Sequence, residues 1–421
     1  MSEFKPIKVG LIGCGQIASS AYMPTILKKF NMVDVVKFAD TIPERAELFA
    51  KTFGGVACTN EEIYNDPEIE VVLNLTFPTS HYKVCKAAIL AGKHVHCEKM
   101  MAVDWAQGKE LVDLAEEKGV YLTFAPDTFL GGAWQTCRHL IDTGAIGQPL
   151  AAYCLVTGGG AARVSIGQST RRDLPEEERP APPWQRMKLP GHNPRGPEGS
   201  GLPFDMGGYY LHNLINMFGN INRVAGYCKA QSPQKTSLDP LNTMYKEFVP
   251  TPDPSTLVGS LEFDSGVLGS VQFVSDVGGR PDQQFVVFGT EATMYCPDPN
   301  FFGGDIVLQT YSGKPMVFDI NRGFLSPERY TIPTWFGYND QSRGVGLMDL
   351  AFAIRNGRKP RCHYSMGLQA FECVHGMIDS CENGVQHKMV SHCERPKAVQ
   401  PGVRGGGFGS TEFEQQSCFD D

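Results

Sequence analysis

The sequence predicts an α/β fold: a doubly wound parallel sheet in the N-terminal part, followed by an α+β domain with a largely antiparallel open sheet. Alternation of apolar and helical stretches predicts the first part, because parallel strands need helical crossovers. The alternation stops after Pro126, and strand patterns dominate from Leu150 onward. At 421 residues, the chain is long enough for two domains and a large core.

The individual elements follow from local patterns. The apolar runs that predict strands lie at 8–12, 33–39, 71–77, 94–97 and 120–125. Helical patterns lie at Glu44 to Phe53, His81 to Ala91, Trp105 to Lys118, Trp134 to Asp142 and Gly344 to Asn356. A hairpin is expected from the two runs that flank Asp264-Ser265-Gly266. We expect the last of these helices to pack back on a sheet.

These elements divide the chain into three parts. We predict a dinucleotide-binding domain at 1–126, a substrate-binding and oligomerisation domain at 127–400, and a C-terminal tail at 401–421. Residues 158–203 are rich in Gly, Pro and charge, which predicts a long loop. The glycines of the tail indicate a segment that is poorly ordered or used in subunit contact.

Composition excludes several classes of protein. The net charge of −8 implies no surface for a nucleic acid. No apolar run approaches the length of a membrane span, and the first strand follows the start too closely for a signal peptide. The 13 cysteines are an odd number without a Cys-x-x-Cys pair. This pattern favours reduced thiols in a cytoplasmic enzyme, with no disulfide framework and no metal site.

A glycine-rich turn follows the first apolar run, in the sequence GCGQIA. Gly13 permits a tight turn, Gly15 lets a pyrophosphate approach the backbone, and Ala18 allows the helix to pack closely on the strand. Gln16 and Ile17 open that helix, whose N-terminus would face the phosphates. In this context the turn predicts a Rossmann dinucleotide site, whereas a phosphate-free glycine turn is the simpler alternative.

The second strand ends at Asp40, where an acid can accept hydrogen bonds from both ribose hydroxyls of NAD. A carboxylate there disfavours the 2′-phosphate of NADP. Arg45, five residues further on, could instead swing toward that phosphate. NAD is therefore the expected cofactor, and NADP stays open.

Two further strands end in polar residues at the same sheet edge. Thr76 and Pro78 would line the nicotinamide side of the crevice, and His81 would either cap the next helix or contact the cofactor. The adjacent Glu98 and Lys99 are a stronger signal. Lys99 can donate to a substrate hydroxyl, and Glu98 can bridge a cofactor ribose and hold the lysine. The alternative for this pair is an ordinary surface ion pair.

A helix in the second domain opens near Asp205 and stops at Gly219. Asp205, Tyr209 and His212 are spaced four and three apart, which places them on one helical face. Asp205 is also a candidate helix cap. His192, in the preceding loop, is a candidate to reach a substrate, although a solvated loop residue is the simpler interpretation.

Three motifs together resemble the Gfo/Idh/MocA family of oxidoreductases. They are Gly13-x-Gly15-x-x-Ala18, Thr76-x-Pro78-x-x-His81 and Ala91-Gly92-Lys93-His94-Val95-x-Cys97-Glu98-Lys99. The family signature is Glu-Lys-Pro, and Met100 replaces its proline here, so Lys99 could be held differently. The resemblance covers nearly the whole chain, because the segments Pro126 to Gly131 and Gly344 to Asn356 also look like family segments.

The resemblance extends to the family pattern Asp-x-Gly-x-His-x-x-Asp on the second-domain helix. Inositol dehydrogenase-like members have an acid/base histidine where this chain has Tyr209, whereas glucose-fructose oxidoreductase-like members have tyrosine. We favour Tyr209 as the acid/base, with Lys99 stabilising its phenolate. His212 would orient the substrate or share the proton, and Asp205 would orient Lys99 or a substrate hydroxyl.

The resemblance implies an NAD(P)-dependent oxidoreductase that transfers a hydride between a sugar or polyol carbinol and the nicotinamide. It also implies a homo-oligomer, a dimer or tetramer, formed through the open face of the second sheet. One alternative is a redox-assisted glycosidase or lyase, which oxidises a glycoside transiently, eliminates the aglycone and returns the hydride. Another is an NAD(P)-sensing regulatory protein without catalysis.

Overall fold

The structure is a computed structural model that describes residues 5–159, 201–230, 234–236, 248–250, 253–277, 284–310, 328–334 and 336–399. Three predictions fall outside these residues. They concern His192, the tail 401–421 and nearly all of the loop 158–203.

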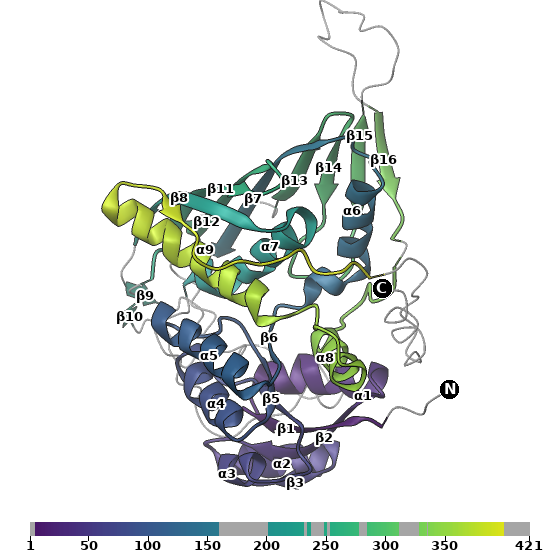
Figure 1. Ribbon diagram of the computed structural model, residues 1–421, viewed down its shortest axis with the longest axis vertical. Helices are drawn as coiled ribbons and strands as arrows, with labels where there is room; N and C mark the ends of the chain where they lie inside the picture. The colour runs from purple at the N-terminus through teal and green to yellow at the C-terminus, as the bar shows by residue number, and fades with distance from the viewer. Residues whose placement is uncertain are drawn as a thin grey trace, which may run out of the picture.

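The first sheet is parallel throughout and has six strands in the described part of the chain. In spatial order these are β3 (Val56–Ala57), β2 (Val33–Ala39), β1 (Ile7–Ile12), β4 (Val71–Asn74), β5 (His94–Cys97) and β6 (Leu122–Phe124). This is the doubly wound order in which the direction of winding reverses between β1 and β4. The predicted Rossmann sheet is confirmed, and in Figure 1 its strands run from β3 at the bottom to β6 nearest the second sheet.

The helices of this first part are η1 (Ala18–Tyr22), α1 (Met23–Lys29), α2 (Pro43–Phe53), α3 (Asn60–Tyr64), α4 (Pro78–Leu90) and α5 (Trp105–Lys118). Helices α2, α4 and α5 match the three predicted ranges to within three residues, the helix expected after the glycine turn is η1 with α1, and α3 was not predicted. The run expected as a strand to residue 77 ends at Asn74, because the Asn74 side chain accepts hydrogen bonds from the backbone and hydroxyl of Thr76. Helix α4 begins three residues earlier than expected, at Pro78, whose fixed φ suits the first helical turn.

The second sheet has nine strands within the described residues, and one neighbouring pair, β7 and β12, is parallel while the others are antiparallel. In spatial order they are β16 (Glu328–Ile332), β15 (Ile306–Thr310), β14 (Ala292–Cys296), β13 (Gln284–Gly289), β7 (Pro149–Gly159), β12 (Leu268–Val277), β11 (Thr256–Phe263), β8 (Ile221–Lys229) and β17 (His387–Lys388). A separate pair joins β9 (Gln234–Thr236) and β10 (Phe248–Pro250). The expected largely antiparallel sheet and its hairpin are confirmed.

Helices cover one face of this second sheet (Figure 1). They are α6 (Gly132–Asp142), which follows the short η2 (Thr128–Leu130), α7 (Leu202–Phe218) and α9 (Tyr364–Asn383). Helix α9 was not predicted from the sequence. Ten consecutive residues of it, 365–374, are buried, and they include the polar Ser365, Gln369 and Glu372, so the buried face does not follow the apolar residues of the sequence.

Helix α8 (Val345–Asn356) returns to the first sheet, where it packs on β2, β5 and β6. The expectation that this segment packs back on a sheet is confirmed, and the sheet is the Rossmann sheet. The link to α9 stays there too, because the Phe124 N–H donates to the Cys362 carbonyl at 3.1 Å. The chain after residue 340 therefore ties both sheets together, which positions its side chains between them.

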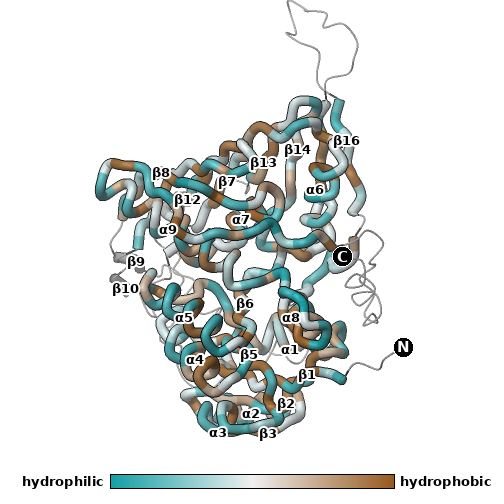
Figure 2. Tube along the Cα trace, in the orientation of Figure 1, coloured by the Kyte–Doolittle hydropathy of each residue, from teal (hydrophilic) through white to brown (hydrophobic). Residues whose placement is uncertain are grey.

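Hydrophobic residues concentrate along the strands, and the outer helices α4 and α5 alternate between polar and apolar residues (Figure 2). All cysteines in the described ranges are free thiols, as the odd, unpaired pattern predicts. No helix among the described residues is both long and apolar enough to cross a membrane.

A buried cluster of charged side chains ties α8 to the segment that follows it. The Asp349 side chain is fully buried and accepts hydrogen bonds from Arg358 at 2.6 Å and from Arg361 at 2.8 Å. Burial opposes the charged form, yet the two guanidinium groups hold the pKa of Asp349 below its ordinary value. Because the folded pKa is lowered, this stabilisation is present above the unfolded pKa, about 4, and is lost as the pH falls.

We expect Asp349→Ala to lower the free energy of unfolding at pH 7 by about 3–5 kcal/mol, because the buried Arg361 and the largely buried Arg358 lose their shared partner. Urea denaturation would measure this change. Asp113→Ala is the matched control, because Asp113 pairs with Lys109 on the exposed surface of α5. The control should lose no more than about 1 kcal/mol. Equal losses in the two variants would contradict the prediction.

Candidate active site

The glycine turn between β1 and η1 has the geometry that a dinucleotide needs. Gly13 has a φ of +103°, and a Cβ there would lie 2.6 Å from the backbone of Leu75. A Cβ on Gly15 would meet no atom within 4 Å, so the space above this residue is open. Gly13 is therefore required by the fold, whereas Gly15 leaves room where a pyrophosphate would approach.

Asp40 lies at the carboxyl end of β2 and holds the turn. Its Oδ2 accepts the Cys14 N–H at 2.8 Å, and its Oδ1 accepts the Ile42 N–H at 2.9 Å. A carboxylate has about four acceptor sites, so each oxygen can still accept a hydrogen bond from a ribose hydroxyl. These observations fit an adenine dinucleotide at this edge.

Arg45 was expected to be able to swing toward a 2′-phosphate, but the structure shows its side chain packed against the protein. It is only 4% exposed, in the first turn of α2. Burial raises the pKa of the nearby Cys14 thiol above its ordinary value, and the charge of Arg45 acts to lower that pKa. To reach a 2′-phosphate, Arg45 would have to leave its packed position.

The role predicted for His81 needs a correction. Its side chain is fully buried, and its ring nitrogens contact the carbonyl oxygens of Met100 at 2.5 Å and Thr76 at 3.0 Å. Both nitrogens face backbone carbonyls, and a neutral ring donates to one of the two, so neither nitrogen is turned toward a cofactor. His81 supports the site instead, because it joins the segment after β4, with Thr76 and Pro78, to the segment after β5.

Glu98 and Lys99 follow β5, and the peptide bond from Lys99 to Met100 is cis. Glu98 is 5% exposed; it accepts the Tyr22 hydroxyl at 2.7 Å and the Lys99 N–H at 3.2 Å. Burial opposes its charge, but Arg343 and Lys99 hold the pKa of Glu98 below its ordinary value. Glu98 is thus a buried carboxylate, and the alternative of a surface ion pair is wrong for it. Glu98 holds Lys99 through the hydrogen bond that its carboxylate accepts from the backbone N–H of the lysine.

Lys99 extends from the first sheet to α7. Its Nζ donates to Asp205 Oδ1 at 2.6 Å and to the Asp205 carbonyl at 2.9 Å, and it lies 5.3 Å from the centre of the Tyr209 ring. Burial opposes the charge, but Asp205 and Tyr209 raise the pKa of Lys99 above its ordinary value. The structure therefore brings together Lys99, Asp205 and Tyr209, as their sequence motifs predict.

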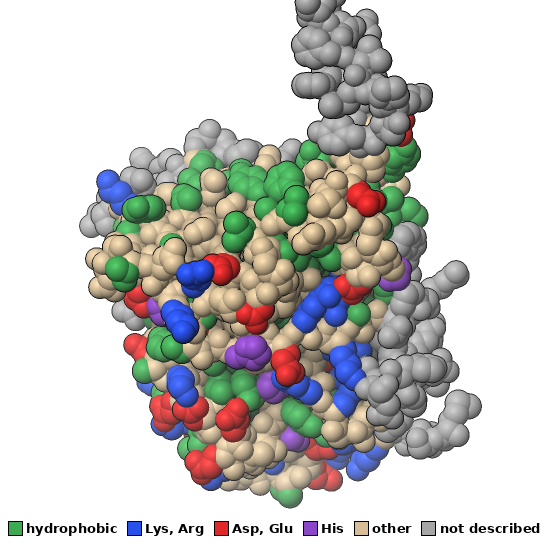
Figure 3. All heavy atoms as spheres, turned by 45° about the horizontal axis from the view of Figure 1, so that its top comes forward, with side chains coloured by type: hydrophobic (Ala, Val, Ile, Leu, Met, Phe, Trp, Pro, Cys, Tyr) green, Lys and Arg blue, Asp and Glu red, His purple; other side chains and the backbone are tan. Residues whose placement is uncertain are grey.

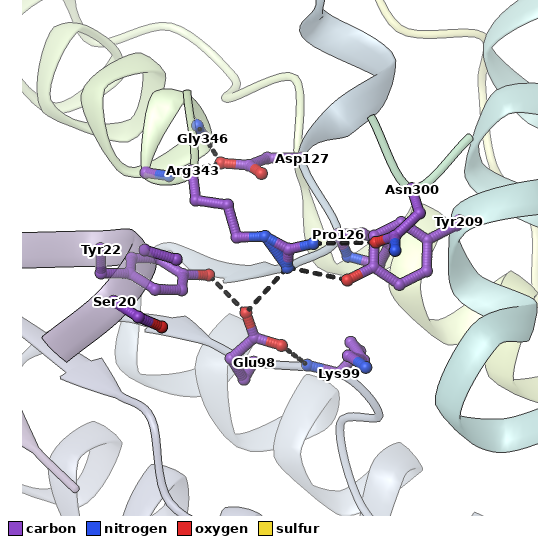
Figure 4. Close-up of polar contacts among 12 residues, drawn as sticks. Ser20, Tyr22, Glu98, Lys99, Pro126, Asp127, Tyr209, Asn300, Arg343 and Gly346 are labelled. Atoms are coloured by element: carbon purple, nitrogen blue, oxygen red, sulfur yellow. Dashed lines mark hydrogen bonds and ion pairs between the residues drawn. The ribbon is translucent and has the colours of Figure 1, made fainter. Parts of the chain in front are cut away.

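Tyr209 is 2% exposed, and its hydroxyl accepts a hydrogen bond from Arg343 Nη1 at 2.8 Å. Figure 4 shows this guanidinium between Tyr209, Glu98 and Asn300. Its Nη2 donates to Asn300 Oδ1 at 3.0 Å. Burial holds the pKa of Tyr209 above its ordinary value, although the nearby charges of Arg343 and Lys99 act to lower it.

His212 lies one turn further along α7 and points elsewhere. Its Nδ1 is 2.9 Å from the Pro126 carbonyl, which can only accept, so Nδ1 carries the proton and Nε2 is the basic nitrogen. Burial lowers the pKa of His212 to about 4, so the ring is neutral at pH 7. The structure thus places the His212 ring against the cis Ala125–Pro126 segment.

Four residues that no sequence motif singled out as site residues complete this cluster: Arg343, Tyr22, Asn300 and Asp127. Asp127 Oδ2 accepts the N–H groups of Gly344 and Gly346 at 2.9 and 3.0 Å, which fixes the start of α8 and hence Arg343. A signal was present, since Asp127 and Gly344 lie in the two further segments that look like family segments. Nothing in the spacing showed that the segments meet.

In the described part of the chain, no group of three or more His, Cys, Asp or Glu side chains could hold a metal ion.

Comparison with known proteins agrees with this geometry. Residues 7–125 match the model of the "Oxidoreductase family, NAD-binding Rossmann fold", and residues 134–295 match the "GFO/IDH/MocA C-terminal domain". An inositol 2-dehydrogenase/D-chiro-inositol 3-dehydrogenase of Lactiplantibacillus plantarum is 31% identical over 160 residues, 36% of this chain and 44% of that protein. A scyllo-inositol 2-dehydrogenase (NADP(+)) of Bacillus subtilis is 32% identical over 142 residues, 33% of this chain and 38% of that protein. These matches span less than half the length of either relative.

Solved structures resemble the chain over a longer range. Levoglucosan dehydrogenase in complex with NADH and L-sorbose superposes with a TM-score of 0.71 at 20% identity, covering 92% of this chain and 100% of that one. The same enzyme with NADH and levoglucosan gives the same TM-score and coverage. At this identity the likeness shows the shared fold. Together with the two family models, it means that the chain belongs to the Gfo/Idh/MocA family of oxidoreductases, with the family's NAD-binding Rossmann domain and C-terminal domain.

Proposed function

We propose that this protein is an NAD(P)-dependent dehydrogenase that oxidises a carbinol of a sugar or polyol. The observation that carries the proposal is the contact of Lys99, from the edge of the Rossmann sheet, with Asp205 and Tyr209 of α7. An ammonium and a phenol therefore meet beside the crevice where a dinucleotide would bind. The inositol and levoglucosan dehydrogenases among the similar proteins support a polyhydroxylated substrate.

The bound nicotinamide would supply the chemistry of hydride acceptance and return. Tyr209 would accept the proton of the substrate hydroxyl as a phenolate, and in the reverse direction its O–H would protonate the carbonyl oxygen. Lys99 uses two of its three N–H donors on Asp205, so one remains for the substrate oxygen. That donor would stabilise the negative charge that develops on the substrate oxygen as its proton leaves, or, in the reverse direction, as the carbonyl carbon accepts the hydride.

Asp205 keeps Lys99 aimed at the ring of Tyr209, which assigns it a positioning role. Its side chain is 55% exposed, so it can also meet a substrate hydroxyl. His212 remains the second candidate for the acid/base. We assign it a supporting role, because its Nδ1 is committed to Pro126 and its ring stays neutral down to a pH of about 4.

We expect His212→Gln to lower kcat by less than about ten-fold, because the glutamine amide can still donate to the Pro126 carbonyl and no proton transfer is lost. The wild-type pH profile of kcat/KM should likewise show no group that titrates near 6.5. Steady-state kinetics from pH 4 to 10 would measure both. A loss of a hundred-fold or more would instead make His212 the acid/base.

We propose NAD as the preferred cofactor, because Asp40 faces the turn with acceptor oxygens and Arg45 is buried. The NADP(+) named for the Bacillus subtilis relative shows that the family accommodates both. The ratio of kcat/KM for the two cofactors would test this preference, and a ratio in favour of NADP would refute it.

We further propose that the chain forms a homo-oligomer through the uncovered face of the second sheet. Hydrophobic side chains lie on that side of the molecule (Figure 3). Cross-strand neighbours share a face, and the neighbours Tyr227 and Val258 are 81% and 41% exposed. Leu268 and Phe288, on either side of Ala151, are 57% and 41% exposed. An apolar surface of this kind favours contact with a second copy, and sedimentation would measure it.

The decisive experiment follows absorbance at 340 nm while purified enzyme meets NAD⁺ and a panel of inositols, free sugars and glycosides. The expected result is net NADH accumulation with at least one polyol or sugar. Release of an aglycone without net NADH would point instead to redox-assisted glycoside cleavage. Cofactor binding without turnover of any panel member would favour the sensor interpretation.

A further inference from the structure

Arg343 stands at the centre of the candidate active site, although it belongs to the segment just before α8. It is 8% exposed, and its guanidinium contacts three groups from different parts of the chain (Figure 4). These are the Tyr209 hydroxyl at 2.8 Å, Asn300 Oδ1 at 3.0 Å and Glu98 Oε1 at 4.0 Å. The last of these oxygens is also the acceptor for the Tyr22 hydroxyl.

The hydrogen bond to Tyr209 has a direction that matters for chemistry. A guanidinium has only donors, so the phenol oxygen must accept from Arg343. The phenol's own hydrogen then has to point away from Arg343. A donor that stays protonated also stabilises the phenolate more than the phenol, which favours loss of the tyrosine proton.

We propose that Arg343 is the positioning residue that sets the direction and the acidity of the Tyr209 hydroxyl. Lys99 acts on the face of the ring, 5.3 Å from its centre, and Arg343 acts on the oxygen itself. The inference rests on the proposed function, because it assigns to Arg343 control of the group that moves the proton in that reaction. Asn300 and Glu98 keep the guanidinium plane in place, which a lysine at this position could not reproduce.

Four charged groups face Tyr209 from the surrounding elements. Arg343 and Lys99 favour the phenolate, whereas Glu98 and Asp205 oppose it. Asp127 and Tyr22 act on Arg343, and His212, on the next turn of α7, is neutral near pH 7. Removing a cation or an anion from this set should therefore move the ionisation of Tyr209 in opposite directions.

The experiment compares Arg343→Gln with Glu98→Gln in the full-length enzyme. The pH at which kcat/KM for oxidation reaches half its plateau should rise by about one unit or more in Arg343→Gln and fall in Glu98→Gln. Arg343→Lys should shift it upward by less. Arg355→Gln is the matched control, because Arg355 lies at the other end of α8 and pairs with Glu70. Its midpoint should equal that of the wild type.

A midpoint unchanged in Arg343→Gln, or displaced in the same direction by both variants, would overturn the inference. If Arg343→Gln fails to fold, the opposite shifts of Arg343→Lys and Glu98→Gln carry the test. Tyrosinate absorbance at 295 nm, with the Tyr209→Phe spectrum subtracted, follows the same ionisation without substrate. If the wild type oxidises no polyol, the proposed function fails, while the absorbance titration still decides whether Arg343 controls Tyr209.

Discussion

Lys99→Ala is expected to lower kcat by about a thousand-fold at saturating substrate, because it removes both a donor to the developing alkoxide and a cation beside Tyr209. The ammonium lies 5.3 Å from the ring centre and is fixed by Asp205 at 2.6 Å. Asp205 is half exposed, so the loss of its partner leaves a solvated carboxylate. The fold should therefore survive, and the effect should appear in turnover.

Lys86→Ala provides the matched control. Lys86 also pairs with a carboxylate, Glu110, but on the exposed surface of α4 and α5. Its kcat should stay within about two-fold of the wild type, since exposed pairs contribute little. Tyr209→Phe should lose about a hundred-fold or more. The double variant should lose less than the product of the two single losses, because the pair acts as a unit. A Lys99→Ala enzyme with near-normal turnover would exclude the mechanism.

Alanine substitutions at the two glycines of the turn should impair different properties: stability for Gly13 and dinucleotide affinity for Gly15. Gly13→Ala is expected to lower the free energy of unfolding by at least about 3 kcal/mol, because the left-handed backbone and the overlap with the Leu75 backbone both penalise a side chain. Gly15→Ala has open space for its methyl group. It should fold normally, yet raise the Kd for the dinucleotide by about ten-fold or more, because the methyl group keeps the pyrophosphate from the backbone.

Each glycine variant is thus the control for the other. Thermal denaturation should separate them without cofactor, and fluorescence titration with NADH should separate Gly15→Ala from the wild type. The prediction fails if Gly15→Ala is as unstable as Gly13→Ala. It also fails if Gly15→Ala binds the cofactor as tightly as the wild type.

Much of the Rossmann half was predictable, because each step there is local. A strand, a glycine turn and a helix follow one another directly, so Gly13, Gly15 and Asp40 could be placed from spacing alone. The meeting of Lys99 with Asp205 and Tyr209 was predicted too, since one motif marks a sheet edge and the other a helix face. The resemblance of both motifs to one family indicated that they belong to the same site.

The features that escaped prediction depend on contacts over long sequence distances. His81 read as a helix cap or cofactor contact, and its true partners are the carbonyls of Thr76 and Met100. Arg343 has no local pattern at all. It reaches Tyr209, 134 residues earlier, only because Asp127 fixes the start of α8.

The sequence by itself therefore determined the fold class, the dinucleotide edge and the residues that we propose for proton transfer, since local periodicity and short motifs indicate them. Only the tertiary structure decided which cations and anions surround Tyr209. Those groups come from the segment after β5, from α7 and from the segment before α8, and electrostatic interactions depend on distance in space rather than on separation along the chain.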